Sequence, residues 1–360
     1  MMEQKRLMIF PYNWDAISLI RNQDKITEYD LVVVCSFKED RNVIDYNLNK
    51  DNLILTVDFE NVLEEVQAVL FCDNLLNIDL NGYVSKLTEA FNRGKEIILS
   101  EKLYYELLNV SEEISVMESK MKIIRNFYQK KPKEVKRILY PIETPVVCIF
   151  GFGEDCDKFN THIAFSNILE DQGYTCLNIY SNSLGKILGG EVLPSFMYSN
   201  KISLCQKTQL FNSYVFDLNR IHNSDIIVIS SPYGIMPRNI YISNKFGEIP
   251  LIISNAVNID MGILCIDFVS DVSDYYIEEL RKLMQYRFST SLGALCVSGV
   301  KKRFRFDDRE QESYYLSPNC INNIKDFTNK DNIFYSFDKK NQNKCLNNII
   351  YKLENNAKIF

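Results

Sequence analysis

The sequence predicts an α/β protein made of two Rossmann-like domains with mostly parallel sheets, joined by a long helix. Short apolar, β-rich runs alternate with helix-length amphipathic segments from the start of the chain, and this alternation is typical of parallel βαβ units. The same alternation begins again near residue 143. Between the two halves, apolar residues recur at alternating spacings of four and three, which indicates a helix that packs along another helix.

Residues 1–100 form the expected first domain. Its clearest helix covers 78–94, where apolar residues fall on one helical face before Gly94 ends the segment. The strands expected in this domain are 6–12, 29–37, 52–57, 66–73 and 96–100.

A bridging segment, 101–142, is expected to hold the long helix and a basic linker. The helix begins after Ser100, a good N-cap, and runs over 101–131 before Pro132 ends it. Its apolar seam either bridges both domains or pairs with a second copy as a homodimer, and the sequence leaves both open. The seam residues are Leu103, Leu107, Val110, Ile114, Met117, Met121, Ile124 and Tyr128.

Residues 143–305 form the expected second Rossmann-like domain, and 306–360 form a C-terminal appendage of one strand and one helix. The expected strands of the second domain are 144–153, 175–181, 224–232, 250–257, 261–269 and 293–300, and its expected helices are 158–171, 205–222 and 272–288. In the appendage, the strand is expected at 333–337 and the helix at 342–357.

The composition argues against several classes of function. Of 360 residues, 41 are basic and 47 acidic, a net charge of −6 that offers no broad electrostatic footprint for nucleic acid. The two histidines, and ten cysteines without any C-x-x-C spacing, argue against a metal site. Most cysteines lie in apolar runs, which suits a reducing cytosol. No segment reads as a secretory signal or a membrane span, so a cytoplasmic protein is expected.

The candidate site follows from the fold class, because ligands of open parallel sheets bind beyond the carboxyl ends of the strands. The second-domain loops selected by this rule are 151–160, 181–186, 230–238 and 254–260. Within them, the candidate cofactor-binding residues are Gly151, Gly153, Cys156, Lys158, Ser230, Ser231, Arg238 and Asn255. No catalytic residue and no cofactor is assigned.

Loop 151–160 is the best candidate for a phosphate cradle, because glycines follow a strand and Lys158 opens a helix whose amides can hold an anion. The loop does not match the P-loop pattern, however. Counting back from Lys158, Asp157 and Phe152 stand where glycines are needed, and Phe159 replaces the magnesium-binding hydroxyl. An ordinary tight turn and a small-ligand or peptide site both remain open.

Three further groups are candidates for chemistry. Cys156 lies near a helix start and close to Lys158, both of which lower a thiol pKa, while its acidic neighbours raise it. His162, six positions on, is its candidate base, and a structural role for the thiol is the alternative. Lys186 and Arg238 are candidates to join Lys158 in an anion or carboxylate site, and the alternative is that each is an ordinary solvated loop charge. The basic run KKRFRF (301–306) reads as an edge strand, either open to a bound peptide or protected by its lysines.

Two blocks of sequence resemble the peptide maturation system proteins of clostridial-type natural-product clusters, which occur beside Cys-rich precursor peptides and radical-SAM maturases. The first block is IFPYNWDAISLIR (9–21), and the second covers 151–196. The residues that carry the resemblance are Phe10-Pro11-Tyr12, Cys156, Lys158, Phe159, Gly173-Tyr174 and Pro194-Ser195-Phe196. The resemblance implies a role in maturing a ribosomally synthesised peptide, as a partner of the precursor or the modifying enzyme, and it transfers no catalytic residue.

Two functions are therefore expected. The leading one is an accessory protein that binds the precursor peptide or the radical-SAM maturase, because the metal motif is absent and the P-loop match fails. The alternative is an enzyme that binds a nucleotide or another phosphorylated metabolite at loop 151–160.

Overall fold

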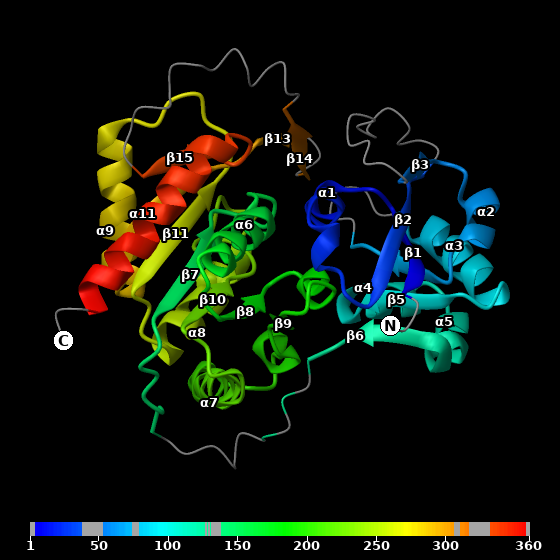
Figure 1. Cartoon of the computed structure of the whole chain (residues 1–360), viewed down its shortest axis with the longest axis horizontal. Helices are drawn as coiled ribbons and strands as arrows, with labels where there is room; N and C mark the ends of the chain where they lie inside the picture. The colour runs from blue at the N-terminus through cyan, green and yellow to red at the C-terminus, as the bar shows by residue number, and fades with distance from the viewer. Residues whose placement is uncertain are drawn as a thin grey trace. The chain divides into compact units, whose positions relative to one another are not determined.

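The computed structural model describes residues 4–37, 53–73, 79–126, 128, 130, 138–305, 310–316 and 332–357. The chain divides into two compact units, Met1–Arg125 with Ser183–Gly190, and Asn126–Asn182 with Glu191–Phe360. Each unit is an α/β domain built on a parallel sheet (Figure 1). The predicted fold class of two Rossmann-like α/β domains is confirmed.

The first unit has a six-stranded sheet in the order β3-β2-β1-β4-β5-β6, which is the strand order of a Rossmann fold. All five strand pairs are parallel. Its strands are β1 (Lys5–Phe10), β2 (Tyr29–Cys35), β3 (Ile54–Thr56), β4 (Ala68–Phe71), β5 (Glu96–Ser100) and β6 (Met121–Ile124), and its helices are α1 (Trp14–Arg21), α2 (Phe59–Val62), α3 (Leu80–Asn92), α4 (Glu101–Leu108) and α5 (Glu113–Met117).

The predicted long helix 101–131 is wrong. Ser100 does cap a helix, its hydroxyl accepting from the Leu103 amide at 3.0 Å, but α4 ends at Leu108. After α5, the chain forms β6 and pairs with β5. Four of the seam residues, Leu103, Leu107, Ile114 and Met117, are buried in the core of the first unit. The seam is thus the shared buried side of two short helices, and no dimer through it is supported.

The second unit has a seven-stranded sheet in the order β15-β12-β11-β7-β10-β8-β9, and all of its strand pairs are parallel. Its strands are β7 (Val146–Gly151), β8 (Cys176–Tyr180), β9 (Glu191–Val192), β10 (Ile226–Ser230), β11 (Met261–Ile266), β12 (Ser291–Val297) and β15 (Ile333–Tyr335), and its helices are α6 (Lys158–Asp171), α7 (Leu204–His222), α8 (Glu248–Ala256), α9 (Asp274–Phe288) and α11 (Lys339–Ala357). A separate antiparallel pair joins β13 (Val300–Arg305) to β14 (Glu310–Tyr315).

Helices cover both faces of the second sheet. Apolar residues of α6 and α11 pack on one face, and those of α7, α8 and α9 pack on the other (Figure 1). The chain leaves β7 for the α6 face, whereas it leaves the neighbouring strands β10 and β11 for the opposite face. The carboxyl end of β7 is therefore the topological switch point at which such sheets bind ligands.

One predicted strand, 250–257, is instead the helix α8. Its buried residues Ile249, Ile252, Ile253 and Ala256 follow the i, i+3, i+4, i+7 pattern of one helical face. Pro250 lies in the first turn, where a missing N–H breaks no helical bond. A short apolar run of this kind is equally compatible with a buried strand and with a buried helix.

The last part of the chain completes the second unit. The strand predicted at 333–337 is β15, which pairs with β12, and the helix predicted at 342–357 is α11. The predicted basic linker lies mostly outside the described residues, as does the stretch 317–331 of the predicted appendage.

Candidate functional site

The turn from β7 to α6 places the candidate site at the switch point. Residues 152–157 bend without any hydrogen-bonded turn. Within the described part of the chain, the backbone N–H groups of Gly153, Glu154, Asp155 and Cys156 donate no hydrogen bond. Asp157, the residue before α6, does not cap that helix with its side chain. Unpaired amides at a helix N-terminus are the arrangement that binds phosphate.

Two glycines allow this turn to close tightly. A Cβ on Gly151 would lie 2.5 Å from Cys156 Sγ and 2.9 Å from the Gly153 carbonyl oxygen, and a Cβ on Gly153 would lie 2.7 Å from Lys302 Nζ. All three distances are shorter than van der Waals contact. The two predicted glycines are therefore required by the close approach of these groups.

Lys158 is buried beneath the turn, with 5% of its surface exposed. Its ammonium donates to the carbonyl oxygens of Gly153, Glu154 (3.0 Å) and Tyr233 (3.3 Å), and lies 3.8 Å from Cys156 Sγ. Among the described residues, no carboxylate lies within ion-pair distance of it. The charge of Lys158 is thus balanced by carbonyl dipoles alone.

A second group of charges adjoins the same turn. Lys302 on β13 has a side chain only 2% exposed, and its Nζ lies 3.2 Å from Asp267 Oδ1 and 3.8 Å from Asp155 Oδ2. Asp267, which directly follows β11, also pairs with Arg238. The predicted residue Arg238 therefore reaches the same edge of the sheet as Lys158, but its guanidinium pairs with a carboxylate there.

Asp157 ties the turn to the neighbouring strands. It adopts a left-handed conformation, with φ of 61°. Its carboxylate accepts from the Gly299 amide at 3.1 Å and from the Ser336 hydroxyl. Because its carboxylate is engaged in this way, Asp157 does not compete with an anion for the amides of the turn.

Cys156 is fully buried, and burial raises the pKa of its thiol to about 11, although the nearby Lys158 ammonium opposes the shift. Its Sγ donates to the Gly153 carbonyl at 3.1 Å. The thiol is therefore protonated at neutral pH and packs inside the turn. Among the described residues, no hydrogen bond joins this thiol to His162, whose Nε2 instead bonds to Asn178 at 3.2 Å and whose ring stacks on Tyr180 with centroids 3.9 Å apart.

The remaining predicted residues lie at opposite ends of the strands. Ser230 and Ser231 are buried at the carboxyl end of β10; Ser230 Oγ accepts from the Ser181 amide at 2.9 Å, and Ser231 Oγ has no partner among the described residues. Asn255 lies in the last turn of α8 and bonds to the Leu251 carbonyl at 2.8 Å. Because α8 leads into the start of β11, Asn255 lies near the amino ends of the strands, away from the carboxyl ends where Lys158 lies. The prediction of Asn255 as a site residue is therefore wrong.

Two groups important to this site are absent from the predicted set. Asp267 ends the buried run ILCID (263–267), and a carboxylate directly after a buried strand is a recognisable signal. Lys302 belongs to the run predicted as an edge strand, and nothing in its spacing indicates that its ammonium reaches residue 155. The candidate Lys186 belongs to the first unit in the division of the chain.

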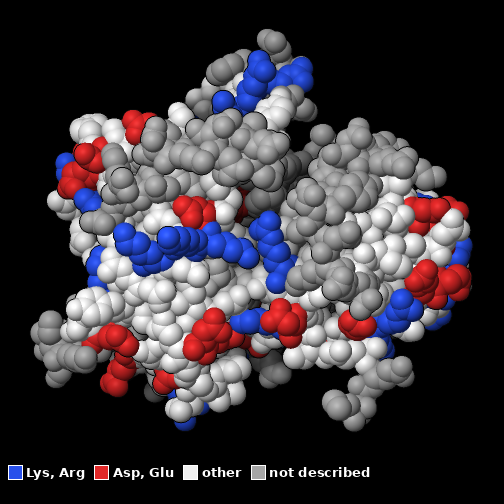
Figure 2. All heavy atoms as spheres, turned by 45° about the horizontal axis from the view of Figure 1, so that its top comes forward, with Lys and Arg blue, Asp and Glu red and all other residues white. Residues whose placement is uncertain are grey.

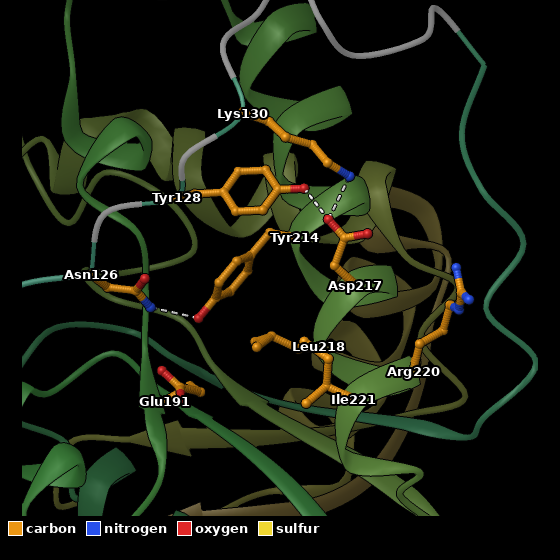
Figure 3. Close-up of a pocket in the computed structure, with 9 residues that line it drawn as sticks. All are labelled: Asn126, Tyr128, Lys130, Glu191, Tyr214, Asp217, Leu218, Arg220 and Ile221. Carbon is orange, nitrogen blue, oxygen red and sulfur yellow. Dashed lines mark hydrogen bonds and ion pairs between the residues drawn. The ribbon is translucent and has the colours of Figure 1, made fainter.

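A second concavity, of about 580 Å³, lies beside α7 and the first residue of β9 (Figure 3). Tyr128 donates to Asp217 at 2.5 Å, and Lys130 pairs with the same oxygen at 2.6 Å. Asn126 Nδ2 donates to the Tyr214 hydroxyl at 2.6 Å. The polar groups that converge here thus satisfy one another, in contrast to the amides of the β7–α6 turn.

On the face drawn in Figure 2, lysines and arginines gather in a row near the centre, and acidic side chains lie above and below that row. Within the described ranges, no set of three or more His, Cys, Asp or Glu side chains is arranged to hold a metal ion. No described helix is long and apolar enough to cross a membrane.

The fold is shared with a solved structure. A DUF1611 family protein from Anabaena variabilis matches over 82% of this chain and 88% of its own, at 12% identity and a TM-score of 0.58. Apo scyllo-inositol dehydrogenase from Lactobacillus casei matches over 49% of this chain and 45% of its own, at 12% identity, with a TM-score of 0.26 that carries no argument. No family model and no curated sequence matches. At these identities the likeness shows the fold alone.

Proposed function

We propose that the second unit binds a nucleotide or another phosphorylated small molecule at the 151–160 loop. The observation that carries this proposal is the buried ammonium of Lys158, which no described carboxylate balances. It lies below four consecutive residues whose amides are unpaired. A buried cation is costly unless it is paired, and a phosphate is the partner that both the ammonium and the amides accept.

The binding step follows from these contacts. The phosphate accepts hydrogen bonds from the amides of Gly153 to Cys156, at the positive end of the α6 dipole. Lys158 then exchanges the carbonyl oxygens of Glu154 and Tyr233 for phosphate oxygens. The proposal assigns binding residues and leaves the reaction, if there is one, unassigned.

The test is isothermal calorimetry with ATP, ADP and inorganic pyrophosphate, each with and without Mg²⁺. Lys158→Met keeps the buried stem and removes the charge, so we expect it to weaken binding by about tenfold or more, the value of one charge-assisted hydrogen bond. Lys282→Met, at an exposed lysine on α9, is the matched control and should bind as the parent does. Saturable binding that Lys158→Met leaves unchanged contradicts the proposed site.

A second candidate function is that of an accessory protein in the maturation of a ribosomally synthesised peptide. One observation favours it: the two blocks that resemble the maturation proteins begin at equivalent places, each at the first strand–helix turn of its unit, β1–α1 and β7–α6. The partner is then the precursor peptide or the radical-SAM maturase. The described cysteines form no disulfide with one another and are mostly buried, as suits a reducing compartment, and the proposal places the protein in the cytoplasm.

This candidate has its own test. Biolayer interferometry with a Cys-rich precursor peptide and with a radical-SAM maturase, each immobilised in turn, should show saturable binding of this protein in the absence of nucleotide. Phe10→Ala and Phe159→Ala, each with its melting temperature recorded, then test the two blocks separately. Binding that neither substitution changes argues against a role for the blocks that carry the resemblance.

A further inference from the structure

Lys302 occupies an unusual place for a lysine. Its Nζ lies between two carboxylates, 3.2 Å from Asp267 and 3.8 Å from Asp155, and its side chain is 2% exposed. Asp155 belongs to the turn itself, and Asp267 follows the strand next to β7. Two carboxylates beside a phosphate site are the ligands that ordinarily hold Mg²⁺. Here a side-chain ammonium has the position between them.

We propose that Lys302 is the built-in cation of this site, so that the site binds a diphosphate-containing ligand without a divalent metal ion. This inference rests on the proposed phosphate-binding function. Two ammonium groups flank Gly153: Lys158 bonds to its carbonyl, and Lys302 Nζ lies 2.7 Å from the position of a Cβ there. Two adjacent phosphoryl groups present charge to both ammonium groups at once.

The charges around Lys302 explain why the metal is replaced. Asp267 is shared between Lys302 and Arg238, and Asp155 has Lys302 as its ion-pair partner. A metal ion at this place would have to displace an ammonium that is fully desolvated and already paired. The lysine also arrives from β13, far from the turn in sequence, so the cation is part of the fold rather than taken from solution.

The experiment measures pyrophosphate affinity by calorimetry in EDTA and in Mg²⁺, for the full chain and its variants. We expect the parent chain to bind in EDTA with an affinity within about threefold of that in Mg²⁺. Lys302→Met should lose about tenfold or more in EDTA. Mg²⁺ should restore part of the loss, because Asp155 then has lost its ion-pair partner and Asp267 keeps only Arg238. Lys301→Met, the exposed neighbour, should match the parent in both buffers.

A double variant keeps the test independent of folding defects. Asp155→Asn together with Lys302→Met removes one unpaired carboxylate with the cation, so weak binding should persist without rescue by Mg²⁺. A parent chain that binds pyrophosphate only with Mg²⁺, or a Lys302→Met variant that binds normally in EDTA, overturns the inference while leaving the phosphate site intact. A parent chain that binds no probe in either buffer overturns the proposed function and the inference with it.

Discussion

The first strand–helix turns of the two units show why one of them is the better candidate for a ligand site. In the first unit, the β1–α1 turn is closed: Asn13 Oδ1 accepts from the Ala16 amide and its Nδ2 donates to the Asp73 carbonyl, both at 2.8 Å. In the second unit, the β7–α6 turn is longer, its amides are unpaired, and two buried ammonium groups adjoin it. Both turns lie at the same place in an α/β sheet, so the fold by itself does not create the site.

Acid should distinguish the two units most strongly. His162, on α6, is buried, and burial lowers its pKa from 6.5 to about 3. The unfolded chain binds this proton near pH 6.5, whereas the folded unit does so only near pH 3. The free energy of unfolding of the second unit should therefore fall as pH decreases through this range, by about 1.4 kcal/mol per pH unit.

Urea unfolding between pH 7 and pH 4, followed by hydrogen exchange of each unit, measures this effect. His162→Gln should reduce the pH dependence, and His222→Gln, at the exposed end of α7, should not. Equal acid sensitivity of both units, unchanged in His162→Gln, rules out the buried imidazole as the cause.

The first unit can be tested through the residues predicted as a helical seam. Leu107 is fully buried in its core, whereas Val110, from the same pattern, is 42% exposed. Leu107→Ala should destabilise the first unit by about 2–5 kcal/mol, because it leaves a cavity. Val110→Ala should cost well under about 1 kcal/mol. Similar losses at both positions, measured by chemical denaturation, contradict the arrangement of α4 in this core.

The close packing of the β7–α6 turn can be tested at Gly151. Gly151→Ala places a Cβ 2.9 Å from the Gly153 carbonyl oxygen and 2.8 Å from Lys158 Cδ, so the turn must move, at a cost of about 1–3 kcal/mol. Gly299→Ala is the matched control, since its Cβ would meet nothing nearer than 3.6 Å. We expect the melting temperature of the second unit to fall only for Gly151→Ala.

The smallest effect is expected at the closed turn. Asn13→Ala removes the N-cap of α1 and should cost the first unit about 1 kcal/mol. Asn13→Ser keeps an N-cap acceptor and should recover most of that loss. If Asn13→Ala is neutral in thermal denaturation, the β1–α1 turn is not held by its cap, and the contrast between the two turns is weaker than the hydrogen bonds indicate.

Much of the fold was predictable because buried parallel strands are continuous apolar runs. The strands β7, β10 and β11 lie within their predicted ranges, and α6 has the predicted bounds. The errors arose where periodicity is ambiguous. The spacing of Leu103, Leu107 and Ile114 suits one long helix or two short ones equally well, and the run 250–257 suits a strand or a buried helix.

The candidate site was predictable in its location but not in its charges. The strand-end rule selected loop 151–160 and Lys158, and the same rule placed Arg238 at that edge. It misplaced Asn255, because the preceding segment was predicted as a strand. It did not reveal Lys302, since the register that brings β13 to the turn depends on contacts far apart in sequence.

The local sequence alone therefore determined the α/β class, the β7–α6 turn and the glycines and lysine within it, because apolar runs, glycines and helix starts act over a few neighbouring residues. Only the tertiary structure decided which charges surround that turn. Lys158, Asp267 and Lys302 are separated by more than thirty residues from one another, and burial of the strands between them sets which ammonium faces a carboxylate and which faces only carbonyl oxygens.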